Sequence, residues 1–396
     1  MSHVHSGKYQ KPRFELAEVF SRYMGSYLET HKLSRLQEKV VDAIQWCRTS
    51  RLGGHKWVCS NGECDYWREE YNSCRNRHCP KCQVSKKLKW VRERLSELLP
   101  IPYYHVVFTM PHSLNLLALY NKELIYDLFF QATSHALNVF AQDPKYLGGK
   151  LGFIGILHTW GQTLWQHIHL HYIVPGGGIS NDGSRWVSLP YRTEFIFPVK
   201  AVSRRVRKKF AELLQKAYDR GELLFPDELA HLKNRSEFKR FLNKVAWEKW
   251  ICYAKKPFSG PEDVVEYIGR YTHRVAISNH RLLNIDDGEV TFRYKKYRDN
   301  TVEHRTMKLT AEEFIRRFLL HVIPRGYKRI RHFGFLSNGC RTKNIELAKR
   351  LLSDLAEKIE EVTDSLLDRC DETDFLKCPV CKSGILEPKP LSLAPG

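Results

Sequence analysis

The chain has 396 residues, 42% hydrophobic and 12% aromatic, which is enough to bury a core and excludes disorder as the default. Lys and Arg number 64 against 44 Asp and Glu, and the net charge of +20 favours a polyanionic partner, nucleic acid before an anionic membrane surface. No run of about eighteen apolar residues occurs and the first residues form no apolar signal segment, which predicts a cytoplasmic protein.

The eleven cysteines are unevenly distributed. Six lie between Cys47 and Cys82, and a pair lies near the end at Cys378 and Cys381. In a cytoplasmic chain such clusters indicate metal ligands or reduced thiols more often than disulfides. The isolated cysteines, which we expect to be small buried residues, are Cys252, Cys340 and Cys370.

The first elements are two segments of helical periodicity, residues 14–28 and 33–46, which we expect to pack on one another or on the module that follows. That module, residues 47–82, combines short Cys-to-Cys spacings with two interleaved histidines, as tetrahedral Zn²⁺ requires. Its candidate ligands are Cys47, His55, Cys59, Cys64, Cys74, His78, Cys79 and Cys82. These residues can hold one or two ions.

For two ions, we expect Cys59, Cys64, Cys79 and Cys82 to bind one, and Cys47, His55, Cys74 and His78 to bind the other. The first set is the firmer prediction. The two histidines have an alternative, because an imidazole beside a zinc site can also contact nucleic acid or support a ligand.

Basic residues follow one another closely at the end of this module. Such runs are often only solvated faces, but in a chain of this charge they favour contact with phosphate groups. The residues are Arg75, Arg77, Lys81, Lys86, Lys87, Lys89, Arg92 and Arg94.

Residues 103–110 and 152–160 are rich in β-branched and aromatic side chains and predict buried strands, with a helical segment at residues 114–141 between them. Residues 166–174 predict a further strand that pairs with residues 152–160 through a turn near Gln162. In that strand, alternation places His167, His169 and His171 on one face and apolar residues on the other.

A single histidine on a strand is usually structural, but three in strict alternation predict a metal site. The hairpin would bring Gln162 or His158 close to that site. The glycines at residues 176–178 follow the strand and leave room for a large substrate to approach.

Two helical segments come next, a basic one near residues 204–209 and a second at residues 236–253. A helix beginning near Pro261 places Tyr267 and Tyr271 one turn apart on one face. Two tyrosines at this spacing more often pack together against a core. Here basic neighbours favour the phenolate form of the tyrosines. These neighbours are Lys255, Lys256, Arg270, His273 and Arg274.

The last part of the chain predicts strands at residues 274–278, 290–294 and 303–309, with a hairpin turn at Asp287-Gly288. Aromatic and basic side chains alternate there, which suits a single-stranded nucleic acid. Helices are expected at residues 311–320 and 342–367. Cys378 and Cys381 form half of a zinc ribbon, which is either a vestige or is completed by Cys340 and Cys370.

The order of elements predicts the α+β class. We expect four parts: an N-terminal helical segment (1–46), a zinc-binding nucleic-acid recognition module (47–100), a central core (101–335) and a C-terminal helix with a cysteine tail (336–396).

With these residues in view, the chain resembles the rolling-circle insertion-sequence transposases of the IS91 type, relatives of the Helitron transposases in the HUH endonuclease superfamily. The likeness runs from about Cys47 to Leu352. Its anchors lie at residues 47–55, 73–82, 160–164, 169–178 and 269–279. The sequence departs from the common pattern at Ile168, where members often have Pro, and in the four-residue spacer between Cys59 and Cys64.

The resemblance implies an antiparallel HUH sheet with flanking helices, in which His169 and His171 bind Mg²⁺ or Mn²⁺ and His167 only accompanies them. Gln162 is our expected third ligand. It further implies that Tyr267 and Tyr271 are two nucleophiles that cleave single-stranded DNA through 5′-phosphotyrosine intermediates and rejoin it. The expected partners are single-stranded DNA and the hairpin ends of the element, in the bacterial nucleoid.

Two other readings use the same residues. A zinc-ribbon DNA-binding regulator would explain the charge and the cysteines without catalysis. A metallonuclease with water as nucleophile would use the histidines and leave both tyrosines dispensable.

Overall fold

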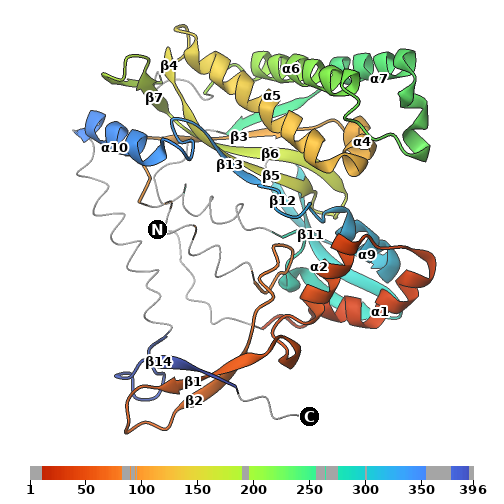
Figure 1. Ribbon diagram of the computed structural model, residues 1–396, viewed down its shortest axis with the longest axis vertical. Coiled ribbons are helices and arrows are strands. Elements are labelled where there is room, and N and C mark those ends of the chain that lie inside the picture. Colours follow the sequence, from red (N-terminus) through yellow and green to blue (C-terminus); the bar gives the residue numbers. More distant parts are fainter. Residues whose placement is uncertain are drawn as a thin grey trace.

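The computed structural model describes residues 11–82, 90, 94, 96–189, 196–255, 264, 275–298, 301–353 and 376–391. In these residues helices are combined with antiparallel sheets, so the predicted α+β class is confirmed (Figure 1). None of the described helices has both the length and the apolar character that crossing a bilayer requires.

The largest sheet has five strands in the order β13-β5-β6-β3-β9, and all neighbouring strands are antiparallel. The strands are β3 (Tyr103–Thr109), β5 (Gly152–Trp160), β6 (Gln166–Pro175), β9 (Ile251–Lys255) and β13 (Ile330–Gly334). The histidine-bearing β6 lies at the centre, between β5 and β3. A central strand is shielded on both edges, which gives the side chains that it carries a rigid base.

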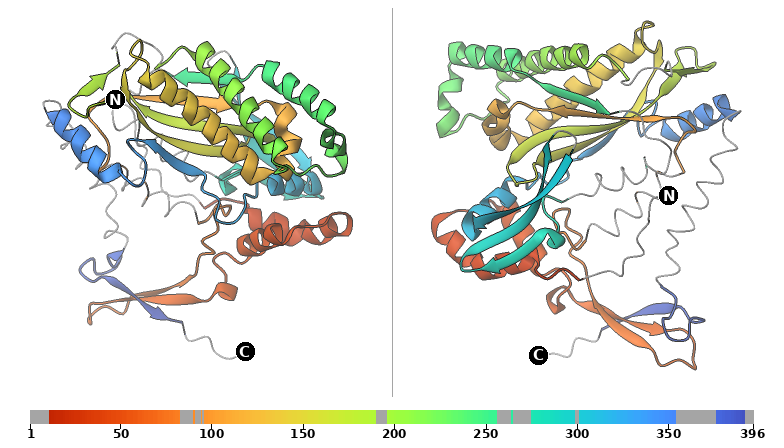
Figure 2. Two further views of the ribbon diagram at one scale, coloured as in Figure 1. Left: turned by 45° about the horizontal axis from the view of Figure 1, so that its top comes forward. Right: turned by 180° about the vertical axis from the view of Figure 1, so that it is seen from behind.

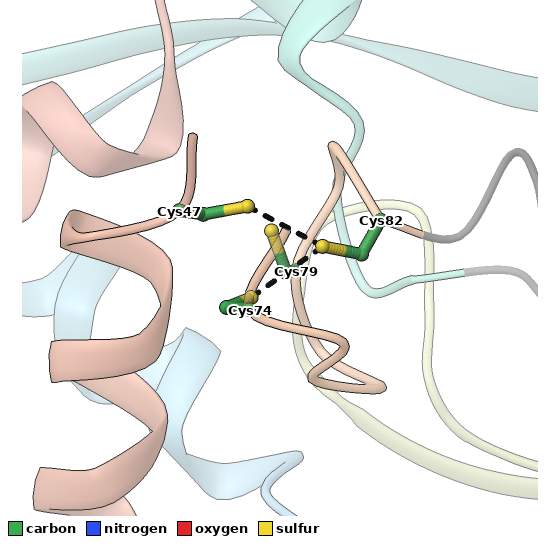
Figure 3. Close-up of side chains that lie close together, drawn as sticks. All are labelled: Cys47, Cys74, Cys79 and Cys82. Carbon is green, nitrogen blue, oxygen red and sulfur yellow. Dashed lines mark hydrogen bonds between the residues drawn. The ribbon is translucent and has the colours of Figure 1, made fainter. Parts of the chain in front are cut away.

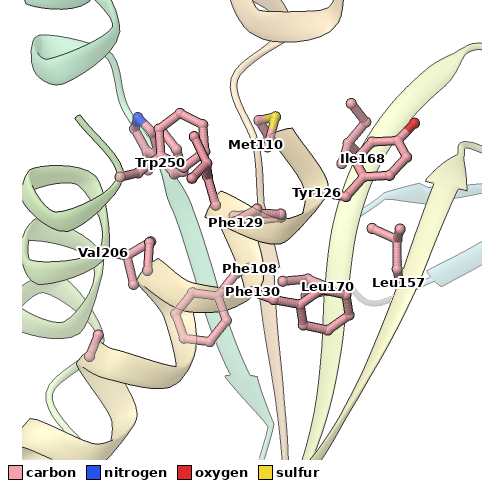
Figure 4. Close-up of a cluster of buried hydrophobic side chains, with 14 of the residues drawn as sticks. Phe108, Met110, Tyr126, Phe129, Phe130, Leu157, Ile168, Leu170, Val206 and Trp250 are labelled. Carbon is pink, nitrogen blue, oxygen red and sulfur yellow. The ribbon is translucent and has the colours of Figure 1, made fainter. Parts of the chain in front are cut away.

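Helices cover one face of this sheet (Figures 1 and 2). They are α4 (Asn115–Tyr120), α5 (Lys122–Gln142), α6 (Val199–Asp219) and α7 (Arg235–Trp247). Strand alternation directs Phe108, Ile168 and Leu170 toward them, where they form one buried cluster with Phe129 and Phe130 of α5 (Figure 4). The apolar half of the alternating β6 sequence therefore anchors the sheet, and the histidines point to the opposite face.

That opposite face carries both the histidines and a smaller apolar cluster. Ile154, Ile156 and Ile173 are buried there together with Val264, the one described residue of the segment 256–274. Ile154 and Ile156 alternate with His158 along β5, and Ile173 follows His171 by two residues on β6, so all share one face.

A second core joins the start of the chain to residues 276–322. It contains α1 (Leu16–Thr30), α2 (Arg35–Gln45), α9 (Ala311–Leu320) and the sheet of β10 (Leu282–Asp286), β11 (Glu289–Arg298) and β12 (Thr301–Thr310). Phe20 of α1 meets Phe318 of α9 edge to face, with ring centroids 5.6 Å apart. Trp160 and Leu164 belong to the same core, which therefore supports the turn between β5 and β6.

Two smaller sheets complete the structure. One lies apart from the large sheet in Figures 1 and 2 and consists of β14 (Leu386–Pro390), β1 (Gly54–Cys59) and β2 (Trp67–Tyr71). The other contains β4 (Gly149–Lys150), β7 (Gly177–Ser180) and β8 (Trp186–Ser188). The remaining elements are α10 (Arg341–Leu351) and the 3₁₀ turns η1 (Ser50–Leu52), η2 (His112–Leu114), η3 (Asp227–Lys233) and η4 (Asn279–Arg281).

Two predicted hairpins are confirmed. β5 pairs antiparallel with β6, and β10 is joined to β11 by Asp287 and Gly288, which have φ values of 49° and 73°. Positive φ at both central residues is the geometry of a type I′ turn, whose twist matches that of the strands it joins.

The helix predicted over residues 236–253 is wrong in its last third. α7 ends at Trp247, and β9 follows as an edge strand on β3. The exposed Ile251 and Tyr253 alternate with the less exposed Cys252 and Ala254, the two-residue period of a strand, and pairing with β3 outweighs local helical preference. Residues 275–278, predicted as part of a strand, form none.

A buried histidine, His321, is expected to make the stability of this fold depend on pH. His321, 2% exposed, has Nδ1 3.3 Å from Thr159 Oγ1 and Nε2 2.9 Å from the carbonyl oxygen of Leu164. Because that carbonyl can only accept, Nε2 carries the proton and Nδ1 accepts from the hydroxyl. Burial, assisted by the charge of Lys122, lowers the pKa of His321 to about 4. The ring is therefore neutral in the folded protein.

Between pH 6.5 and about 4 the unfolded chain binds a proton at this position that the folded chain does not, so stability falls as the pH is lowered. From pH 7.5 to 5 we expect His321 to remove on the order of 2 kcal/mol of unfolding free energy. Urea unfolding of the wild type and of His321→Gln at both pH values measures this. An equal pH dependence of the two proteins would contradict the assignment.

Candidate metal centres

Three histidines from two neighbouring strands form a compact group on the face of the large sheet opposite the helices. His158 of β5 lies directly opposite His169 of β6, and His171 follows two residues along. Their candidate ligand nitrogens all lie within 4.8 Å of one another. His158 and His171 are buried, and His169 is half-buried. Such a cluster can bind one divalent ion and keep one side open to a ligand.

Hydrogen bonds orient two of the three rings. His169 Nδ1 lies 2.8 Å from the carbonyl oxygen of His167, to which it can only donate. His171 Nδ1 lies 2.9 Å from Nε2 of His105, a buried residue of β3. Because both Nδ1 atoms are engaged, Nε2 is the atom that each ring offers to a metal. This arrangement is typical of metal-binding histidines, whose second nitrogen is fixed by a neighbour.

The donor set fits a borderline transition-metal ion better than a hard one. Neutral imidazoles bind Mn²⁺, Fe²⁺ or Zn²⁺, whereas Mg²⁺ prefers oxygen ligands and keeps several waters. Three protein nitrogens leave coordination positions for water or for the oxygens of a phosphate.

The structure places Gln162, our expected third ligand, differently. Its side-chain oxygen accepts a hydrogen bond from the backbone amide of Lys295 at 3.3 Å, and its carbonyl accepts one from Arg281. Gln162 thus fixes the turn between β5 and β6 to strand β11. The residue that lies beside His169 and His171 is His158 instead. His167 is outside the group of three, with its ring 4.9 Å from that of His169 and 5.6 Å from that of His112.

Several predicted site residues lie outside the described residues. They are the two nucleophiles Tyr267 and Tyr271, their basic neighbours Lys256, Arg270, His273 and Arg274, the side chain of Lys255, and Lys86, Lys87, Lys89 and Arg92 of the basic run at the end of the zinc module. Val264 is described, and it is buried against Ile154, Ile156 and Ile173 on the face that carries the histidines. The chain therefore passes over this face three residues before Tyr267 and seven before Tyr271.

The cysteines form two groups of four, divided differently from our expectation. Cys47, Cys74, Cys79 and Cys82 have their sulfurs within 4.8 Å of one another (Figure 3). Cys82 Sγ lies 3.3 Å from that of Cys47 and 3.5 Å from that of Cys74. Four sulfurs at about 2.3 Å from one Zn²⁺ are about 3.8 Å apart, so this group needs only slight expansion to hold the ion.

Cys59 and Cys64 belong to the second group, together with Cys378 and Cys381 of the C-terminal tail. The predicted division of zinc ligands was therefore wrong, and Cys340 does not join the tail pair, whereas Cys370 lies outside the described residues. Strand pairing is the reason: β14 lies beside β1 and carries the tail to Cys59.

Neither histidine of the zinc module belongs to a cysteine group. His78 is buried, its Nε2 accepts from the backbone amide of Ile323 at 3.4 Å, and burial lowers its pKa to about 3. His55 lies on β1 with its ring 5.0 Å from that of Trp57. Arg77, predicted to contact DNA, donates to the carbonyl of Tyr327 at 2.6 Å, whereas Arg75 is exposed. Arg75 is thus better placed for a phosphate.

The first cysteine group is part of the second core, since Cys47, Cys79 and Cys82 are buried in it beside α1 and α2. Cys79→Ser is therefore expected to lower the unfolding midpoint by at least about 10 °C, because zinc binding contributes directly to folding free energy. Thermal unfolding with Cys340→Ser as control measures the effect. Equal midpoints for the two variants would exclude a structural ion there.

Comparisons with known proteins agree with this arrangement. A family model described as "Transposase zinc-binding domain" matches residues 19–110, and one described as "Putative transposase" matches residues 152–344. A protein of Sinorhizobium fredii described as "Putative transposase y4qJ" is 44% identical over 376 residues, 93% of each chain. The "Transposase for insertion sequence element IS801" of Pseudomonas savastanoi pv. phaseolicola is 29% identical over 312 residues, 78% of this chain and 73% of that protein. No solved structure matches the chain.

Proposed function

This chain belongs to the IS91-type family of zinc-binding transposases, and from that premise we propose that it cleaves and rejoins single-stranded DNA by metal-assisted tyrosine chemistry. The observation that carries the proposal is the group of His158, His169 and His171 on the face of the sheet opposite the helices. Val264, which precedes Tyr267 by three residues in the sequence, is buried on the same face.

In the proposed reaction a tyrosine phenolate attacks a backbone phosphorus of the DNA. The bond between phosphorus and the 3′ oxygen breaks, the 3′ oxygen takes up a proton, and the phenol has released one. The products are a 5′-phosphotyrosine and a free 3′-hydroxyl. Because the phosphodiester energy is retained in the new ester, attack by a 3′-hydroxyl reverses the step and rejoins strands without ATP.

Different residues of the chain have different roles in the proposed reaction. The three histidines would hold the divalent ion, which when bound withdraws charge from the phosphate oxygens and orients the scissile bond. The carbonyl of His167 keeps His169 in the tautomer that presents Nε2, and His105 engages Nδ1 of His171, which leaves Nε2 of that ring toward the ion. Tyr267 and Tyr271 supply two nucleophiles, so that one DNA end can be held while another is cut. Basic neighbours such as Arg270 and Arg274 favour phenolate.

Features near the histidine site support a nucleic-acid substrate. Trp165 in the turn between β5 and β6 is 50% exposed, and the guanidinium of Arg317 lies over its ring at 4.1 Å. The adjacent hairpin of β11 and β12 carries exposed basic residues and Tyr297, which is 65% exposed. Exposed aromatic rings among cations suit the stacking of unpaired bases and contact with phosphates. The single-stranded and hairpin ends of the element are the proposed partners.

The test is incubation of the purified protein with end-labelled single-stranded oligonucleotides from the ends of its element, with Mn²⁺, Mg²⁺ or EDTA, on a denaturing gel. We expect cleavage with either metal, at lower concentrations of Mn²⁺ than of Mg²⁺, and none in EDTA. Cleavage that leaves no protein on the DNA would favour the water-using nuclease. Binding without cleavage on every end sequence would favour the DNA-binding regulator.

A further inference from the structure

The second cysteine group is assembled from the two ends of the chain. Cys59 ends β1 and Cys64 lies in the following turn, whereas Cys378 and Cys381 precede β14. Cys59 Sγ lies 3.5 Å from Cys381 Sγ, across 322 positions of sequence, and Cys64 Sγ lies 3.7 Å from Cys378 Sγ, across 314. These separations are near the roughly 3.8 Å of four thiolates on one tetrahedral Zn²⁺. Neither pair alone supplies four ligands.

The turn after Cys381 has the features of a zinc knuckle. The amide of Gly384 donates to Cys381 Sγ at 3.3 Å, and its carbonyl accepts from the amide of Cys378 at 2.8 Å. A Cβ at Gly384 would lie 2.3 Å from Cys59 Sγ, so only glycine lets the backbone pass this sulfur. Lys382 occupies the left-handed region, with φ of 58°. The turn is therefore shaped around sulfurs from the other end of the chain.

The tail is also held by contacts that involve no sulfur. β14 pairs antiparallel with β1 over five residues, from Cys59 opposite Leu386 to His55 opposite Pro390. Ser60 N donates to the carbonyl of Ile385 at 2.8 Å, and Ile385 N donates to Ser60 Oγ at 2.9 Å. Without β14 the sheet would be the two-stranded hairpin of β1 and β2, which is marginally stable alone in water. Strand pairing and ligand geometry thus place the tail at the same position.

We propose that the protein carries a second structural Zn²⁺ bound by Cys59, Cys64, Cys378 and Cys381, which fastens the C-terminal tail to the N-terminal zinc module. The zinc-domain match ends at residue 110 and the other match at residue 344, so neither includes the tail pair. This site is independent of the tyrosine chemistry. Its consequence is that the N-terminal module is incomplete until residues 378–390 are in place.

The test measures zinc per chain by mass spectrometry after dialysis of the full-length protein against metal-free buffer. Every protein in this test carries His158→Ala and His169→Ala, so that only thiolate-bound zinc is counted. With all cysteines intact the protein is expected to hold two ions, and with Cys378→Ser/Cys381→Ser one. The Cys59→Ser/Cys64→Ser variant should also hold one, and the quadruple variant should still hold one, because both pairs serve the same ion. Cys340→Ser, a cysteine outside both groups, is the matched control and should hold two.

Alkylation of the thiols separates loss of this site from general unfolding. In Cys59→Ser/Cys64→Ser we expect Cys378 and Cys381 to react with iodoacetamide while Cys47, Cys79 and Cys82 remain protected. Three zinc counts would overturn the proposal: one ion with all cysteines intact, two ions in either double variant, or none in the quadruple variant while the thiols of the first group stay protected. So would tail thiols that stay protected when Cys59 and Cys64 are replaced.

Discussion

His158→Ala is expected to lower the rate of single-strand cleavage roughly 10³-fold at a fixed Mn²⁺ concentration. His158 lies opposite His169 on the neighbouring strand, with its ring centroid 4.7 Å from that of His171. Loss of one of three ligands weakens metal binding, and a metal contributes several kcal/mol to stabilising the charge of a phosphoryl-transfer transition state. Cleavage rates as a function of Mn²⁺ concentration would show whether high metal rescues the variant.

Gln162→Ala is the matched control, because Gln162 lies in the same hairpin and was the ligand expected from sequence. Its side-chain oxygen accepts only the amide of Lys295 in the described structure, so we expect its rate to stay within about threefold of the wild type. Isothermal titration of both variants with Mn²⁺ gives a readout that needs no turnover. The reverse order, with Gln162→Ala inactive and His158→Ala active, would contradict the three-histidine site.

Replacing both Tyr267 and Tyr271 with Phe is expected to abolish the covalent protein–DNA adduct and to lower cleavage by at least about 10⁴-fold. Phe keeps the ring and removes the oxygen that would attack phosphorus, and loss of a nucleophile costs this much or more in other covalent enzymes. Single variants should differ from each other, since the proposal gives the two phenols successive roles. The adduct is quantified on denaturing gels with 5′- and 3′-labelled strands.

Tyr253→Phe is the control, because Tyr253 is an exposed residue of β9 and is not among the proposed nucleophiles. Its adduct yield should equal that of the wild type. If the double variant still cleaved DNA at the wild-type rate, water would be the nucleophile and the tyrosines would serve packing only.

Local sequence was sufficient for the features that depend on alternation and turn chemistry. The three alternating histidines predicted both the strand and the shared face of its histidines, and the β5 and β6 hairpin follows from adjacent apolar runs. The Asp287-Gly288 turn was likewise predictable, because those residues tolerate positive φ. In each case the deciding interactions lie within a few residues of one another.

Features set by exact strand register or by distant pairing were not predictable. His158 was a candidate beside Gln162, and the choice depends on the register of β5 on β6, which contains an irregularity between His158 and Trp160. The division of the cysteines depends on β14 reaching β1 across more than 300 positions. Spacing alone favoured partners close in sequence. The tail pair Cys378 and Cys381 was nevertheless a usable signal, since half of a zinc ribbon requires a second half.

The most direct measurement of the central claim is mass spectrometry of the covalent complex. The protein is incubated with a short single-stranded end oligonucleotide and Mn²⁺, digested with trypsin and nuclease, and searched for peptides carrying a nucleotide. The account predicts a 5′-nucleotide on Tyr267 or Tyr271, absent in EDTA and in His158→Ala. Cleaved DNA without any modified peptide, or a nucleotide on another residue, would contradict it.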